Sequence, residues 1–298
     1  MIRSAFICMV VFLNVQMVSA CDICGCAAGG NYLGILPNYK QHFAGIRYKY
    51  SHYHSVHQAD GTFGDDYFNT AELWGRYVPH RKVQLFGILP MQYTRRVEDQ
   101  RTNTVQQLGD ASILANVILF NNSDSIFSDW KQAFQLGGGI KFPTGNHTVV
   151  QDQHTLPAAM QTGTGSIDFL INALYTLRFK KSGINLDLAY RINTANAQHY
   201  RFGNRTSCSV RYFYWKNYRQ ISILPHVGID IEHAQEDQKY QRAVEFTGSH
   251  SLLANFGVDA YFDRFSVGIN LQQPIKQYLN QGQTSSSLRL SMQAIFLF

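Results

Sequence analysis

The end of the sequence alternates between apolar and polar side chains. From Leu288 to Phe298 every second residue is apolar, and the residues between them carry a polar series up to Gln293. A repeat of two places successive side chains on opposite faces of an extended chain. The segment therefore predicts a β-strand with one apolar face and one polar face.

The same alternation recurs throughout the chain beyond residue 40. It is clear over residues 134–142, 184–192, 221–231 and 265–271. We expect about twelve strands, each near the length that a tilted membrane strand needs. The expected strands start near residues 42, 68, 81, 108, 132, 166, 183, 206, 220, 252, 264 and 286.

The expected connections alternate between short turns and long polar loops. The long set covers residues 52–66, 96–106, 143–165, 195–205, 233–249 and 273–285. Short turns at one end and long loops at the other are typical of outer-membrane barrels. Only 15% of residues are charged, whereas Tyr and Phe number 17 and 20. The fold class predicted is all-β: a transmembrane antiparallel up-and-down β-barrel over residues 42–298. The alternative is a secreted sandwich, whose apolar faces would pack on each other.

The first twenty residues have the features of a secretory signal. Arg3 precedes an apolar run from Ala5 to Leu13, and small residues precede Cys21. We expect residues 1–20 to be a signal peptide cleaved before Cys21. Residues 21–41 would then form a periplasmic cysteine-rich segment, a candidate plug or metal site. The expected location is the bacterial outer membrane with a periplasmic N-terminus.

Charge and the terminal strand indicate the partners. The net charge of +6 comes from scattered Lys and Arg with no basic stripe, which argues against nucleic acid as a partner. Outer-membrane lipid would contact the apolar faces. The alternating last strand, ending on Phe298, resembles the signal that outer-membrane barrels present to the barrel assembly machinery.

The stretch "LGGGIKFPTGNHTVVQDQHTLPAAMQTGTGSIDFLINALYT", Leu136 to Thr176, resembles a bacterial family of outer-membrane transporters. That family is labelled after the meta-cleavage pathway of phenol degradation. "LGDASILANVILF", Leu108 to Phe120, also resembles a strand of the family, and "CDICGCAAGGNYLGILP" is similar to the start of its Bacteroidetes members. The resemblance implies a membrane barrel and a transport role, and the phenol label is weak guidance to the solute.

If the apolar faces contact lipid, the opposite faces line the lumen. This predicts a mixed lining with a basic excess: Arg47, Lys49, Arg76, Lys141, Asp168, Arg178, Asp187, Arg191, Arg211, Asp230, Glu232 and Arg289. Such a lining could guide a polar or weakly anionic solute, or it could close on itself as salt bridges. For any single residue the structural role is favoured.

Two prolines and one loop stand out in the predicted barrel. Pro90 and Pro225 interrupt strands, which indicates a β-bulge at each, or else a local opening in the wall. The loop from Pro143 to Gly165 is the longest and could fold inward as a constriction.

The sequence argues against an enzyme. A hydrolase built on a barrel strand needs Ser and His on the same face, two residues apart. Ser249 and Ser51 are each followed directly by His, which puts the two side chains on opposite faces, and no GxSxG motif is present.

Two groups are candidates for metal binding. His52, His54 and His57 lie near Asp60, Asp65 and Asp66 and could hold Cu(II), Zn(II) or Ni(II), although solvated loop histidines are commoner. Cys21, Cys24 and Cys26 have a C-x-x-C-x-C spacing that suits Cu(I) or Zn(II). Val18 to Cys21 also fits a lipobox, so Cys21 is a lipidation candidate, and a disulfide is the third reading. No cofactor is certain.

The sequence thus supports two functions. The first is a channel or transporter for a small solute, either a hydrophobic or aromatic compound or a metal-related one. The alternative is a metal-binding or sensing outer-membrane protein whose closed barrel is an anchor.

Overall fold

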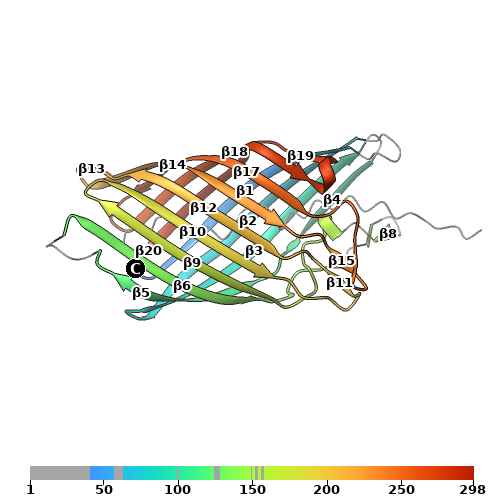
Figure 1. The fold of residues 1–298 in the computed structure, drawn as a ribbon, viewed down its shortest axis with the longest axis horizontal. Helices are drawn as coiled ribbons and strands as arrows, with labels where there is room; N and C mark the ends of the chain where they lie inside the picture. The colour runs from blue at the N-terminus through green and yellow to red at the C-terminus, as the bar shows by residue number, and fades with distance from the viewer. Residues whose placement is uncertain are drawn as a thin grey trace, which may run out of the picture.

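The computed structural model describes residues 41–56, 63–98, 101–123, 128–148, 150–151, 154–155 and 158–298. Residues 1–40, with the predicted signal peptide and Cys21, Cys24 and Cys26, lie outside these ranges, as does His57. No helix in the described ranges is long and apolar enough to cross a membrane. The described chain is dominated by long strands that run side by side (Figure 1).

Twelve long antiparallel strands within the described ranges form one closed wall. In chain order they are β1 (Phe43–Val56), β2 (Phe63–His80), β3 (Val83–Glu98), β5 (Ser112–Asn121), β6 (Trp130–Lys141), β9 (Asp168–Phe179), β10 (Ser182–Ile192), β12 (Arg205–Tyr214), β14 (Ile221–Ala234), β17 (Ser249–Tyr261), β18 (Phe265–Leu279) and β20 (Arg289–Leu297). Each pairs with the next, and β20 pairs with β1, with Leu297 opposite Phe43. The predicted up-and-down barrel is confirmed.

Short elements extend the wall or lie in the connections. The wall is extended by β4 (Arg101–Leu108), β13 (Lys216–Tyr218) and β19 (Thr284–Ser286). The connections hold β7 (Val150–Gln151), β8 (His154–Thr155), β11 (Tyr200–Arg201), β15 (Gln238–Lys239), β16 (Arg242–Ala243) and the 3₁₀ turns η2 (Ala158–Met160) and η3 (Asn280–Gly282). In Figure 1, β8, β11 and β15 lie at one end of the barrel and the C-terminus lies toward the other.

The period-two pattern determines which side chains point inward. In β3, Gln84, Phe86 and Ile88 are buried, whereas Leu85 and Leu89, of the opposite parity, are exposed. The exposed set across the barrel is mostly apolar, as expected for a surface that contacts lipid. The inner set is divided between charged or amide side chains and an apolar inner cluster, which consists of Phe43, Trp74, Phe86, Ile88, Leu114, Leu170, Leu174, Ile295 and Leu297.

The first two long loops of the prediction are wrong. β1 continues to Val56 and β2 begins at Phe63, while β3 reaches Glu98 and β4 starts at Arg101. The strands continue beyond membrane length because the ladder stays paired, for instance between His54 and Asp65. The inward residues Ser51, Tyr53 and Ser55 include both polar and aromatic side chains. The sequence therefore shows no clear period-two pattern over this extension of β1.

The prediction of a β-bulge or a local opening at each proline is confirmed on one side of each strand. Across from Pro90 the register shifts by one residue between the pairs Ile88–Ser112 and Met91–Leu108, as in a β-bulge, whereas beside Pro225 the ladder is interrupted without a shift. Register runs unbroken through Pro90 against β2 and through Pro225 against β17. On the other side of each, the neighbouring strand is interrupted: β4 gives way to β5 across from Pro90, and β12 gives way to β13 across from Pro225. The structure thus places each proline, which has no N–H to donate, beside a break in the ladder.

The described part of the loop between β6 and β9 folds against the inner wall. Met160 is fully buried and packs on Val105 of β4, and Thr162 and Thr164 are buried as well. The Thr162 hydroxyl lies 3.4 Å from the Gln107 amide oxygen of the same strand. The predicted inward fold is confirmed for residues 160–166.

Candidate functional site in the barrel lumen

A buried cluster at one end of β6 joins the long loop to the wall. Lys141 lies with its Nζ 2.7 Å from Asp110 Oδ2 and 2.6 Å from Asp168 Oδ2, and it also donates to the Thr164 hydroxyl. The contacts with Asp110 and Thr164 are hydrogen bonds, and the contact with Asp168 is an ion pair. We call Asp110, Lys141, Thr164 and Asp168 the loop-anchoring cluster.

The two carboxylates of this cluster also bind loop backbone. Asp110 accepts hydrogen bonds from the N–H groups of Gly145 (3.0 Å) and Thr164 (2.9 Å). Asp168 accepts one from the Thr194 N–H at 2.9 Å and one from the Ser166 hydroxyl at 2.8 Å. The cluster therefore fixes two outer connections to the wall through charge-assisted bonds.

Close backbone contact explains a glycine in the same loop. A Cβ on Gly163 would lie 2.4 Å from the Gly145 carbonyl oxygen and 2.8 Å from Asp110 Oδ1. A side chain would push the loop away from the carboxylate that holds it. The segments that carry the family resemblance, around Asp110, Lys141 and Thr164, thus meet at one place, and their geometry is that of a structural lock.

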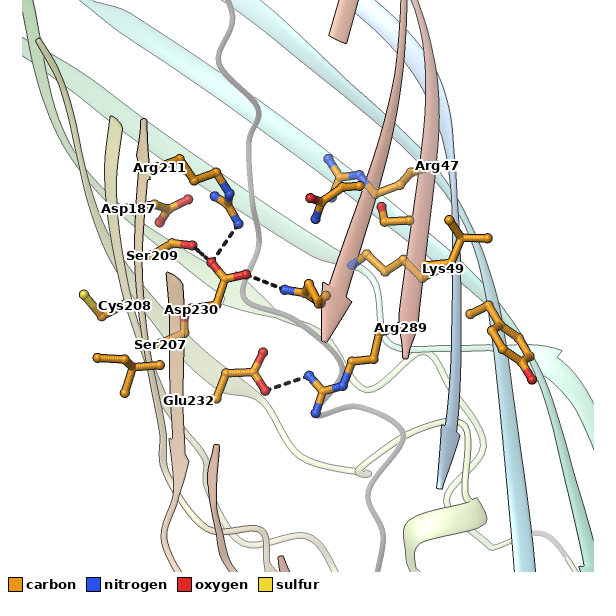
Figure 2. A pocket seen from close by; sticks show the side chains of 16 residues that line it. Arg47, Lys49, Asp187, Ser207, Cys208, Ser209, Arg211, Asp230, Glu232 and Arg289 are labelled. Atoms are coloured by element: carbon orange, nitrogen blue, oxygen red, sulfur yellow. Dashed lines mark hydrogen bonds and ion pairs between the residues drawn. The ribbon is translucent and has the colours of Figure 1, made fainter. Parts of the chain in front are cut away.

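A second charged region surrounds a cavity of ≈ 70 Å³, the central cavity, in the middle of the barrel. Its charged lining comprises Arg47, Lys49, Asp187, Arg211, Asp230, Glu232 and Arg289. Figure 2 shows Arg47, Lys49 and Arg289 on one side and Asp187, Asp230 and Glu232 on the other. All seven belong to the predicted lumen set.

The basic side of the cavity comes from β1 and β20. Arg47 and Lys49 share the carboxylate of Glu72 on β2, at 3.3 Å and 2.8 Å. The Arg47 guanidinium also lies 3.9 Å from the centre of the Trp74 ring, within range of a cation–π contact. Arginine thereby connects the charged region with the apolar inner cluster.

The acidic side comes from β10, β12 and β14. Asp230 receives hydrogen bonds from Arg211 (2.9 Å), Asn255 (2.7 Å) and Gln272 (2.7 Å), and another from the Ser209 hydroxyl. Asp187 is 7% exposed and makes no side-chain hydrogen bond to any described residue. The two neighbouring acids therefore differ, because Asp230 accepts four hydrogen bonds and Asp187 accepts none from the described side chains.

An ion pair lies between the central cavity and a second one. Glu232 Oε2 is 2.9 Å from Arg289 Nη1, and both residues line the central cavity and a cavity of ≈ 40 Å³. This outer cavity is also lined by Tyr53, Leu279 and Asp237. The pair is therefore the partition between the two spaces.

The other predicted lumen residues have different surroundings. Arg76 is buried, donates to the Gln41 carbonyl oxygen and lies over the Phe43 ring. Arg178 lies 4.9 Å from the centre of the Trp215 ring. Arg191 acts electrostatically on Lys49 and Glu72 across the barrel. Lys141 and Asp168 face inward but belong to the loop-anchoring cluster.

The histidines of β1 point outward near its end. The ring nitrogens of His52 and His54 lie 2.8 Å and 3.1 Å from the same oxygen of Asp65. Burial raises the pKa of the Asp65 carboxyl, but these hydrogen bonds outweigh it and leave the pKa below its usual value. Within the described ranges no three His, Cys, Asp or Glu side chains form a group that could hold a metal ion.

Ser and His remain on opposite faces of their strands. Ser51 is buried inside the barrel, whereas His52 bonds outward to Ser287 and Asp65. Cys208 is a free thiol of intermediate exposure, paired in register with the outward-facing Leu188 and Ile231.

Several inner residues were not found from the sequence. Glu72, which neutralises Arg47 and Lys49, and Asp110, which holds the loop, are absent from the predicted set. Glu72 follows the same parity as Arg76 on β2 and lies within the strand predicted to start near residue 68, so parity alone could have found it. Asp110 lies between β4 and β5, where strand parity gives no signal.

The fold is similar to that of solved outer-membrane barrels. The crystal structure of the COG4313 outer membrane channel from Pseudomonas putida F1 matches 91% of this chain and 99% of its own, with 12% identity and a TM-score of 0.64. The beta domain of the Bordetella autotransporter BrkA matches 87% of this chain and 100% of its own, with 8% identity and a TM-score of 0.51. No protein-family model and no curated protein matches the sequence. At these identities the likeness establishes the fold: the chain is a closed twelve-stranded barrel of the outer-membrane type.

Proposed function

We propose that the protein is an outer-membrane channel or transporter for a small solute. The observation that carries this proposal is the central cavity, whose charged lining keeps polar atoms that the described wall does not satisfy. Among these atoms are Arg289 Nε and the amide oxygen of Asn270. A lumen with such atoms in its middle offers a passing solute places to bind.

The apolar parts of the lumen favour a solute with an aromatic or other apolar portion. Phe43, Trp74 and Phe86 face inward on adjacent strands, and Tyr53 and Phe68 form a smaller cluster beside the outer cavity. Aromatic rings contact each other and arginine favourably. An aromatic compound is therefore the preferred reading of the solute, in line with the resemblance to transporters labelled by phenol degradation. A metal-related solute would depend on Cys21, Cys24 and Cys26, outside the described ranges.

The proposed location is the outer membrane of a bacterium. The exposed apolar belt supports contact with lipid, and aromatic residues such as Tyr77, Trp130 and Phe179 are exposed next to short turns. The barrel assembly machinery is the proposed route of insertion. A periplasmic N-terminus, cleavage before Cys21 and lipidation of Cys21 remain predictions from the sequence.

Single-channel recording in planar bilayers tests the proposal. A channel gives reproducible conductance steps with the refolded full chain, and swelling of liposomes in an aromatic solute reports passage of that solute. Absence of steps and of swelling, in protein whose barrel is intact, would overturn the channel and leave the closed anchor with a Cu or Zn site at its thiols. Ile171→Val, at an outward-facing side chain that lines neither cavity, is a matched control that leaves both readouts unchanged.

A further inference from the structure

We infer that the central cavity is a binding site for a small zwitterion, with the anionic group at Lys49 and Arg289 and the ammonium group at Asp187. The inference deepens the proposed function because it names the polar end of the solute. Binding at this site is nevertheless measurable whether or not the barrel conducts.

The twelve-stranded closure brings the two sides of the site face to face. Lys49 lies on β1 and Asp187 on β10, six strands away along a wall of twelve. The two residues line the same cavity from opposite sides (Figure 2). Among the described residues, Arg211 is the one cation on the acidic side that lines the cavity. It donates a hydrogen bond to Asp230 and acts on Asp187 electrostatically, without a hydrogen bond between them.

The basic side keeps donors for a ligand. Lys49 makes one side-chain hydrogen bond among the described residues, to Glu72, so two of its three ammonium donors are available to the cavity. The Nε of Arg289 is buried and has no hydrogen-bond partner within the described chain, because its bond to Glu232 uses Nη1. An anionic group between Lys49 and Arg289 would satisfy both.

The acidic side keeps an acceptor. The carboxylate of Asp187 is more than nine-tenths buried and has no hydrogen-bond donor in the described part of the wall. Buried acceptors without donors are costly, so an ammonium group at this side would be favourable.

The size of the cavity limits the ligand. A volume of ≈ 70 Å³ has room for about five groups of the size of a water molecule. That is enough for the ammonium and carboxylate of an amino-acid-like head group. A simple anion would satisfy the basic side and leave Asp187 without a hydrogen-bond donor from the described residues, and a simple cation would leave the basic side unsatisfied, whereas a zwitterion satisfies both sides.

Calorimetric titration of the full chain in detergent micelles tests the site with three probes: glycine, acetate and methylammonium. We expect glycine to bind at least about tenfold more tightly than either singly charged probe, the difference that one further charge-assisted hydrogen bond gives. Lys49→Gln should weaken glycine and acetate but not methylammonium. Asp187→Asn should weaken glycine and methylammonium but not acetate.

The crossed pattern separates a binding role from a folding role. Lys180→Gln, which removes a lysine charge at an exposed turn and does not line the cavity, should leave all three affinities unchanged. The inference is overturned if glycine binds no more tightly than acetate to the wild type, or if both charge variants weaken all three probes equally in barrels that keep their heat-modifiable mobility. Conductance without glycine binding would contradict this inference and leave the proposed channel standing. Glycine binding without conductance would contradict the proposed channel and leave this inference standing.

Discussion

The loop-anchoring cluster and the central cavity contain the same kinds of side chain but differ in how completely those side chains are paired. In the cluster, Lys141 forms ion pairs with both Asp110 and Asp168 and a hydrogen bond with Thr164, and the carboxylates bind loop backbone. At the cavity, Lys49, Asp187 and Arg289 retain unused hydrogen-bonding capacity. Buried charge alone therefore does not identify a binding site in a barrel lumen, and the number of unused donors and acceptors is the better guide.

The largest effect is expected where pairing is complete. Lys141→Met would leave the Asp110 and Asp168 carboxylates buried without their cation, a loss of about 3–5 kcal/mol for a broken buried pair. We expect a lower unfolding midpoint in urea and rapid proteolysis within residues 143–165. Lys180→Gln, in an exposed pair with Asp129, is the control and should change neither. Equal unfolding midpoints and equal proteolysis of the two variants would contradict the role of the loop-anchoring cluster in holding the loop to the wall.

A smaller loss of stability is expected at the partition between the cavities. In Glu232→Gln, Arg289 loses its charged partner but still borders the cavity and is not fully enclosed by protein. The loss of unfolding free energy should therefore stay below the ~3 kcal/mol of a fully enclosed pair. Conductance should rise, because the charged contact between the two cavities is removed. A urea midpoint as low as that of Lys141→Met, with unchanged conductance, would show that the pair is structural like the loop-anchoring cluster.

The barrel was predictable from the sequence because its signal is repeated along the chain. Strands such as β10 and β20 alternate cleanly, so the fold class and the inward parity of Arg47, Asp187 and Asp230 follow from single segments. The pairing of these residues does not follow, since it depends on strand tilt and on the register across distant strands. The family resemblance includes the stretch around Lys141, but only the folded structure shows that Lys141 is paired with Asp110, Asp168 and Thr164.

The comparison extends to a buried acid in an outer connection. Asp237 accepts hydrogen bonds from the Tyr200 hydroxyl (2.6 Å) and the Gly203 N–H (2.7 Å), yet burial dominates and raises its pKa. The folded state then holds this proton more tightly than the unfolded state does. Stability from this group therefore increases as the pH falls from neutral toward the unfolded pKa of about 4, and decreases as the pH rises again.

Asp237→Asn tests that sign. The difference in melting temperature between wild type and variant should shift in favour of the wild type on going from pH 7.5 to pH 5. A difference that is independent of pH, or that shifts the other way, would mean that the Tyr200 and Gly203 bonds outweigh burial.

The smallest effect is expected where pairing occurs without burial. Asp65 is paired with His52 and His54, but its side chain is 39% exposed, so solvent screens the interaction. Its lowered pKa has the opposite sign to that of Asp237: the contribution is present above the unfolded pKa of about 4 and is lost as the pH falls through the folded value. Asp65→Asn should therefore cost less than about 1 kcal/mol at pH 7 in urea unfolding, and less still as the pH falls through the folded value. A cost approaching that of Lys141→Met would contradict the view that burial, and not pairing alone, decides how much a charged cluster contributes in this barrel.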